Sequence, residues 1–64
     1  MKMCELNAIL IQDGKREPIM ESVTRMVVDD DVIELTGIFG ERQIVPGSII
    51  EVNFSKGETI ILGK

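Results

Sequence analysis

Apolar and polar residues alternate along several short runs of the chain, and turn-forming residues separate these runs. Alternation with a period of two places successive side chains on opposite faces of an extended chain, so each run predicts a β-strand. No stretch has the period of an amphipathic helix. The predicted strands cover residues 5–12, 17–23, 25–28, 32–38, 41–45, 49–54 and 58–62.

The segments between the predicted strands carry residues that favour chain reversal. Glycine and aspartate tolerate the positive φ of tight hairpin turns, and three adjacent carboxylates solvate well in an exposed turn. In one of these turns Phe39 is expected to pack over the core. The predicted turns are Asp13-Gly14, Asp29-Asp30-Asp31, residues 36–41, Pro46-Gly47 and Lys56-Gly57.

The number and spacing of the predicted strands indicate the fold class. About seven short strands joined by short turns are typical of all-β barrels and sandwiches. Pro18 has no backbone N–H, which places it at a strand start or a sheet edge. We therefore predict that residues 1–64 form a single all-β domain, a small SH3- or Sm-like barrel of about seven short antiparallel strands, because closure leaves few exposed edges.

The first predicted strand carries aliphatic side chains on both faces. Leu6, Ala8 and Leu10 would face one side, and Ile9 and Ile11 the other. Such a strand is expected to be buried on both faces or to lie in an interface. Because a chain of 64 residues has little interior, a two-fold interface between two copies is the simplest way to bury the surplus. We therefore predict a homodimer.

Charge and hydropathy narrow the class of partner. The chain has eleven acidic and seven basic side chains and a net charge of −4, the opposite of what a protein that neutralises many phosphates carries. No run approaches the roughly 20 apolar residues that cross a bilayer, and the start of the sequence lacks the apolar stretch of a signal peptide. The prediction is a soluble, cytoplasmic protein with no membrane segment, for which nucleic acid is a disfavoured partner.

Two residue counts argue against an enzyme. The sequence contains no His, which excludes catalysis built on imidazole, such as Ser-His-Asp and Cys-His pairs. Its single Cys excludes an intrachain disulfide and a multi-cysteine zinc site within one chain. A chain this small also has little room for a deep substrate pocket. We therefore predict a protein without catalytic activity.

Cys4 admits two interpretations. Most free cysteines are small buried hydrophobic residues, and Cys4 would then only help to start the first strand. Alternatively, its thiolate is a soft metal ligand that selects late transition metals over Mg²⁺ or Ca²⁺. A single thiolate needs further ligands, which the terminal amine, deprotonated backbone amides or the Cys4 of a second copy could supply. Amine, amide and thiolate close together suit square-planar Ni²⁺ or Cu²⁺.

Other candidate residues favour structural roles. The acidic turn at residues 29–31 lacks the spaced ligands and the glycine of a calcium loop, so a solvated hairpin tip is expected. Met20 and Met26 are expected to fill gaps in the core rather than to bind Cu⁺ together with Met1 and Met3. Lys15 and Arg16 could contact a phosphate, but no aromatic residue accompanies them as a platform for base stacking.

Several segments together resemble the CooT family, small proteins associated with nickel handling and the maturation of carbon monoxide dehydrogenase. The resemblance covers nearly the whole chain. It rests on Met3-Cys4-Glu5-Leu6, Ala8, Asp13-Gly14, Ile33-Glu34-Leu35-Thr36, Ile38-Phe39-Gly40-Glu41 and Ile49-Ile50-Glu51-Val52.

The resemblance implies a compact β fold, a homodimer and one nickel ion bound by the cysteine that follows the initiator methionine. Carried over to this sequence, that ligand is Cys4, with the backbone nitrogens of Met3 and Cys4 completing the inner shell. The sequence departs from the family pattern because Met1 and Lys2 precede Met3. A start at Met3 would restore the family arrangement, in which the terminal amine lies one residue from the thiolate.

Three functions follow from these observations. The leading one is a nickel-binding accessory protein, a metallochaperone or metal sensor whose client is a metalloenzyme. The second is a small RNA-binding or assembly module of Sm-like type that would use Lys15, Arg16 and Arg42 on one face; the family also bears an RNA-binding label through its likeness to small barrels. The third is a homodimeric β module in which Cys4 is merely buried.

Overall fold

The computed structural model describes residues 5–64, and all of its regular elements are β-strands. No helix that could span a membrane is present in this part of the chain. The all-β prediction is therefore confirmed for these residues. The five strands are β1 (Leu6–Gln12), β2 (Lys15–Asp29), β3 (Val32–Gly37), β4 (Arg42–Asn53) and β5 (Glu58–Gly63).

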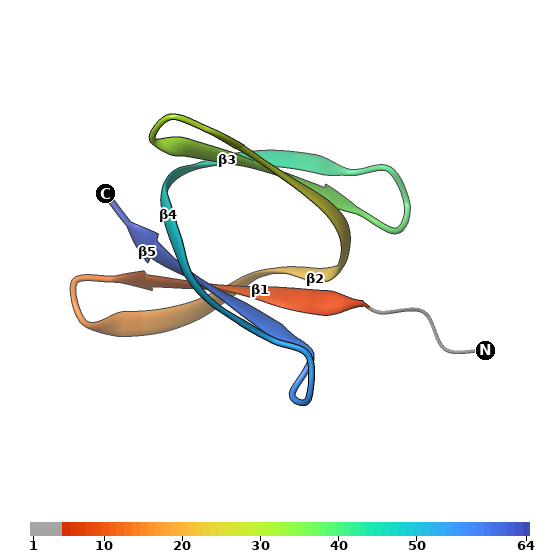
Figure 1. Cartoon of the computed structure of the whole chain (residues 1–64), viewed down its shortest axis with the longest axis horizontal. Helices are drawn as coiled ribbons and strands as arrows, with labels where there is room; N and C mark the ends of the chain where they lie inside the picture. The colour runs from red at the N-terminus through yellow and green to blue at the C-terminus, as the bar shows by residue number, and fades with distance from the viewer. Residues whose placement is uncertain (1–4) are drawn as a thin grey trace.

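The strands form a closed barrel in the order β1-β2-β3-β4-β5 (Figure 1). Each strand pairs antiparallel with the next along the chain, and β5 returns to pair with β1 in parallel. The parallel ladder follows from the strand number, because an odd number of strands that alternate in direction brings the first and last together in the same direction. The expectation of antiparallel pairing throughout is thus wrong at the closing ladder.

The prediction of about seven strands is also wrong, because two long strands each include two predicted ones. Residues 17–23 and 25–28 are the two halves of β2, whose first half pairs with β1 and whose second half pairs with β3. Most of residues 41–45 and of residues 49–54 likewise belong to β4, which pairs first with β3 and then with β5. Both strands bend sharply and so take part in two walls of the barrel (Figure 1).

The bend in β2 lies at Ser22, which has a positive φ of 55°. Register shifts interrupt both ladders next to it, as expected of a β-bulge that turns a strand. The Ser22 N–H donates to Oδ1 of Asn7 at 3.2 Å, and the Ser22 carbonyl accepts from the N–H of Ile38 at 3.0 Å. These two bonds satisfy backbone groups that the bulge removes from the ladders.

The bend in β4 lies just after Pro46-Gly47, where the register shifts between Ile49 and Glu51. We had predicted that Pro46-Gly47 ends a strand. The strand instead continues through both residues, because Pro46 still pairs with Val32 and Gly47 with Gly63. A Cβ atom at Gly47 would overlap the carbonyl oxygen of Leu62, so only glycine lets the two backbones approach this closely.

The tight turn at Asp13-Gly14 agrees with prediction, and the turn predicted at Asp29-Asp30-Asp31 is one residue shorter, because Asp29 belongs to β2 and pairs with Val32. Asp13 and Gly14 have φ values of 54° and 75°, and Gln12 pairs with Lys15 across them. Positive φ at both central residues defines the hairpin turn whose twist matches that of the flanking strands. Pro18 lies in the half of β2 that pairs only with β1 among the described residues, which confirms its expected place at a sheet edge.

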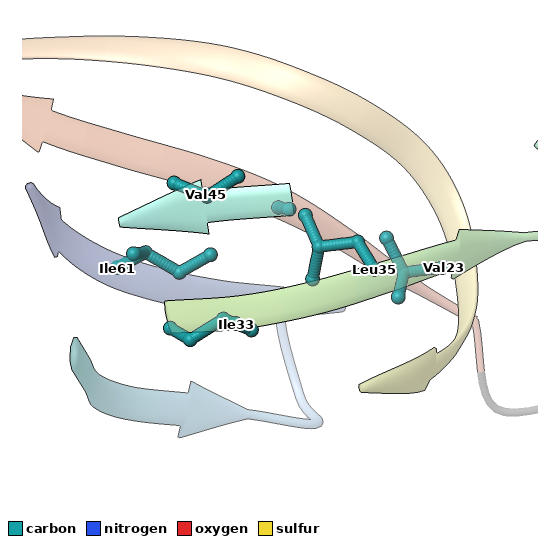
Figure 2. Packing of buried hydrophobic residues seen from close by; sticks show 6 residues of the cluster. Val23, Ile33, Leu35, Val45 and Ile61 are labelled. Atoms are coloured by element: carbon teal, nitrogen blue, oxygen red, sulfur yellow. The ribbon is translucent and has the colours of Figure 1, made fainter. Parts of the chain in front are cut away.

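Aliphatic side chains fill the barrel (Figure 2). Ile33, Leu35 and Ile61 are fully buried, as is Ala8 on β1. Met20 and Met26 are partly buried and pack against this cluster, as expected of methionines that fill core gaps. The core is made up of Ala8, Val23, Ile33, Leu35, Val45 and Ile61.

Candidate functional site

The two residues predicted to hold a metal, Met3 and Cys4, lie outside the described residues. The structure therefore defines the surroundings of Glu5, the residue that follows Cys4. Glu5 and the start of β1 lie at the same end of the barrel as the β3–β4 turn (residues 38–41) and the β4–β5 turn (residues 54–57) (Figure 1). We call this the amino end.

Hydrogen bonds hold the start of β1 between these two turns. The Ser22 hydroxyl donates to the Glu5 carboxylate at 3.3 Å, and Ser22 in turn accepts from the N–H of Ile38 in the β3–β4 turn. On the other side, the Asn7 N–H donates to the carbonyl of Gly57 in the β4–β5 turn at 2.7 Å. The position from which the chain continues back to Cys4 is therefore set by contacts to both turns.

The described residues offer no metal site of their own. Residues 5–64 contain no group of three or more His, Cys, Asp or Glu side chains that could hold an ion. The acidic turn agrees with its prediction as a hairpin tip, since Asp29, Asp30 and Asp31 are exposed and Asp31 pairs with Lys64. A metal site with protein ligands would therefore depend on the donors contributed by the segment around Cys4.

The β3–β4 turn overturns one expectation. Phe39 was expected to pack over the core, but its side chain is 90% exposed. The reason lies in Glu41, whose carboxylate accepts from the Phe39 N–H at 3.0 Å and whose side chain occupies the space that a Cβ at Gly37 would need. This arrangement closes the turn with polar bonds and leaves the ring in solvent.

The second phenylalanine is also in a turn at the amino end. Phe54 follows β4 and is 70% exposed, while the Lys56 N–H donates to Oδ1 of Asn53 beside it at 3.0 Å. Both aromatic residues of the chain therefore lie in solvent at the amino end, where Glu5 leads into β1. Sequence analysis had placed Phe54 at the end of the alternating run 49–54, but β4 ends at Asn53 and Phe54 begins the turn.

A groove that sequence analysis did not identify lies between β2 and the β3–β4 turn. Its volume is about 420 Å³, and both apolar and acidic side chains line it. The lining residues used below are Ile19, Met20, Glu21, Ser22, Ile38, Phe39, Glu41 and Arg42.

The basic residues assigned to RNA binding do not come together. Lys15 and Arg16 begin β2 beside the β1–β2 hairpin, whereas Arg42 begins β4 beside the β3–β4 turn, at the opposite end of the barrel (Figure 1). Arg16 and Arg42 are also engaged with carboxylates, at 3.7 Å from Glu58 and 4.0 Å from Glu34. RNA binding stays a prediction that this arrangement does not favour.

Comparisons with known proteins agree on one family. The model of the CO dehydrogenase accessory protein CooT matches residues 3–62. The crystal structure of a Carboxydothermus hydrogenoformans protein assigned as a CooT superposes with a TM-score of 0.86 at 21% identity, covering 95% of this chain and 98% of that one. At this identity the superposition shows a shared fold. No curated protein matches. The chain belongs to the CooT family of CO dehydrogenase accessory proteins.

Proposed function

We propose that the chain binds Ni²⁺ through the thiolate of Cys4 and serves CO dehydrogenase as a metallochaperone or metal sensor, without catalytic activity of its own. The observation that carries this proposal is the family match, which begins at Met3 and so includes Cys4. Two facts support it: Cys4 is the only thiol of the chain, and residues 5–64 offer no competing cluster of ligands.

The proposed inner shell consists of the Cys4 thiolate and the backbone nitrogens of Met3 and Cys4. These donors lie on adjacent residues, and nitrogen together with sulfur suits a square-planar Ni²⁺ ion. The ion would favour the deprotonated thiol, so binding releases protons and weakens as the pH falls. The neighbouring carboxylate of Glu5 is a hard ligand that already accepts from Ser22, which makes it a poor competitor for this role.

We further propose that the protein is a homodimer. In the parallel ladder Ile11 pairs with Leu62, and alternation directs their side chains and that of Ile9 away from the core cluster. Ile60, which pairs with Ile9, is already buried at 5% exposure and adds nothing to this face. Leu62 is 47% exposed, and Ile9 and Ile11 are half-buried. A second copy that covers this outer apolar face would bury aliphatic surface that the small barrel cannot enclose. A strict monomer in sedimentation at high protein concentration would contradict this interface.

The small, strongly bent barrel supports a structural proposal as well, namely that the fold is of the SH3- or Sm-like type. This proposal does not carry the function, because a shared fold does not establish a shared activity.

Cys4→Ala tests the metal site. We expect the variant to lose stoichiometric Ni²⁺ binding in calorimetry and to keep the wild-type thermal unfolding curve, because the substitution removes the one thiolate and leaves the barrel intact. For the wild-type protein we expect the affinity to decrease when the pH is lowered.

Glu5→Gln is the matched control, because it changes the adjacent side chain and leaves the thiol in place. We expect it to bind Ni²⁺ with unchanged stoichiometry. Equal affinity of Cys4→Ala and wild type would refute the assignment, and loss of binding in Glu5→Gln alone would transfer the site to the carboxylate.

A further inference from the structure

The groove between β2 and the β3–β4 turn has a structural origin in the bend of β2. β3 ends at Gly37, which pairs with Val23, so the half of β2 before the bend has no ladder with β3. The turn that follows β3 continues past this point, and its Ile38 N–H bonds to the Ser22 carbonyl at 3.0 Å. A space therefore remains between the turn and the first half of β2.

The walls of the groove are apolar. Ile19 and Met20 of β2 contribute half-buried side chains that also pack against the core cluster. Ile38 and Phe39 contribute exposed side chains from the turn, at 40% and 90% exposure. An exposed aromatic ring next to half-buried aliphatic residues is typical of a surface that binds another protein, where such a ring becomes the buried anchor of the interface.

The rim of the groove is acidic. Glu21 and Glu41 line it together with a single cation, Arg42, which is already engaged with Glu34 at 4.0 Å. Neither Glu21 nor Glu41 takes part in the three ion pairs formed among the described residues. A symmetric contact between two copies through this groove would bring these carboxylates close to their own duplicates, which opposes association. The charge therefore favours a basic partner over a second copy.

The groove also lies next to Glu5, the residue that follows Cys4 in the sequence. Ser22 lines it and donates to the carboxylate of Glu5, whose Cα is about 3.8 Å along the chain from that of Cys4. A protein seated in the groove would therefore lie beside the residue that directly follows the only thiol of the chain.

We infer that this groove is the docking surface for the client metalloenzyme, which presents an apolar side chain flanked by Lys or Arg. The inference rests on the proposed function for the identity of the client. The Phe39 ring supplies the apolar anchor, and Glu21 and Glu41 supply the electrostatic complement. Docking through this groove would bring the client to Glu5, one residue along the chain from the proposed nickel ligand Cys4.

The test measures binding of the full chain to immobilised nickel-free CO dehydrogenase, without added nickel, so that docking is read separately from metal binding. Phe39→Ser is expected to weaken binding roughly ten-fold or more, because it removes the buried anchor. Glu21→Lys is expected to slow association and to reduce its dependence on salt. Phe54→Ser is the matched control, since Phe54 is exposed in the neighbouring turn and does not line the groove.

Three results would overturn the inference. The first is that Phe39→Ser binds CO dehydrogenase as tightly as wild type, and the second is that Phe39→Ser and Phe54→Ser lose the same amount of affinity. The third is that Phe39→Ser no longer self-associates in sedimentation, which would assign the groove to a second copy. Calorimetry with Ni²⁺ keeps the two proposals apart. If Cys4→Ala loses nickel binding but Phe39→Ser still docks like wild type, only the groove proposal is rejected. If Phe39→Ser docks more weakly but Cys4→Ala still binds nickel fully, only the metal-site proposal is rejected.

Discussion

The two ends of the barrel present opposite kinds of surface. The end opposite the amino end, which we call the hairpin end, carries the β1–β2 and β2–β3 turns and the C-terminus (Figure 1). Its two hairpin turns contain only Asp13-Gly14 and Asp30-Asp31 between paired residues. The amino end has two turns of four residues, and each exposes a phenylalanine.

Hydrogen bonding explains the contrast. At the hairpin end the Gly47 N–H donates to the Asp31 carbonyl at 2.7 Å, the Lys64 N–H donates to the Pro46 carbonyl at 3.3 Å, and the Lys64 ammonium pairs with the Asp31 carboxylate. At this end the backbone groups of neighbouring segments are hydrogen-bonded to each other, and charged side chains lie on the outside. At the amino end the turns are also closed by hydrogen bonds, but apolar rings are outermost. The difference suggests that the hairpin end closes the barrel and that the amino end is available to partners.

The largest effect is expected from the core that supports both ends. Leu35→Ala should lower the free energy of unfolding by about 2 to 5 kcal/mol, because it removes a fully buried side chain and leaves a cavity. Urea denaturation measures the change. Leu62→Ala is the control on the outer face, where the side chain is 47% exposed, and a comparable loss there would show that this face is as tightly packed as the core.

At the hairpin end the close approach of two strands should make Gly47 costly to replace. Gly47→Ala would set a methyl group against the Leu62 carbonyl, and we expect a loss of about 2 to 3 kcal/mol in the free energy of unfolding. Gly14→Ala provides the comparison, since φ at Gly14 is 75° but nothing lies within 4 Å of the added atom. It should cost only about 1 to 2 kcal/mol, the penalty of a left-handed residue. Equal losses at both glycines would remove close approach as the cause.

The smallest effect is expected at the amino end. Phe39→Ser should change the free energy of unfolding by no more than about 0.5 kcal/mol, because the ring already lies in solvent. Thermal and urea unfolding of the variant beside wild type would show this. A loss of several kcal/mol would mean that Phe39 supports the barrel, and the contrast between the two ends would then fail.

Much of the fold was predictable from local patterns. Alternation located part of each of the five strands, and Asp13-Gly14 identified a hairpin turn whose backbone angles only a few residues tolerate. The strand count was not predictable in the same way. In β2 the register shift beside Ser22 bends the strand without ending it, and alternation alone reads such a phase change as a boundary. In β4 the Pro46-Gly47 pair predicts a turn, although both residues stay paired within the strand.

The candidate site was likewise only partly predictable from the sequence. Residue chemistry left Cys4 open between a buried residue and a soft metal ligand, and only the family resemblance favoured the ligand. The sequence did not reveal the groove, whose residues 19–22 and 38–42 come from separate parts of the chain. For Phe39 it favoured burial, since an aromatic ring is usually buried, whereas the hydrogen bond from its N–H to Glu41 closes the turn with the ring outside.

The sequence by itself thus determined the β class, the tight turns, the apolar residues available for a core, and the one thiol with its chemistry. These properties depend on residue type and on neighbours a few positions away. The tertiary structure alone decided that five strands close through a parallel ladder and that both phenylalanines lie exposed in turns at the amino end. Such features arise from contacts between residues distant in the chain, which local preferences do not specify.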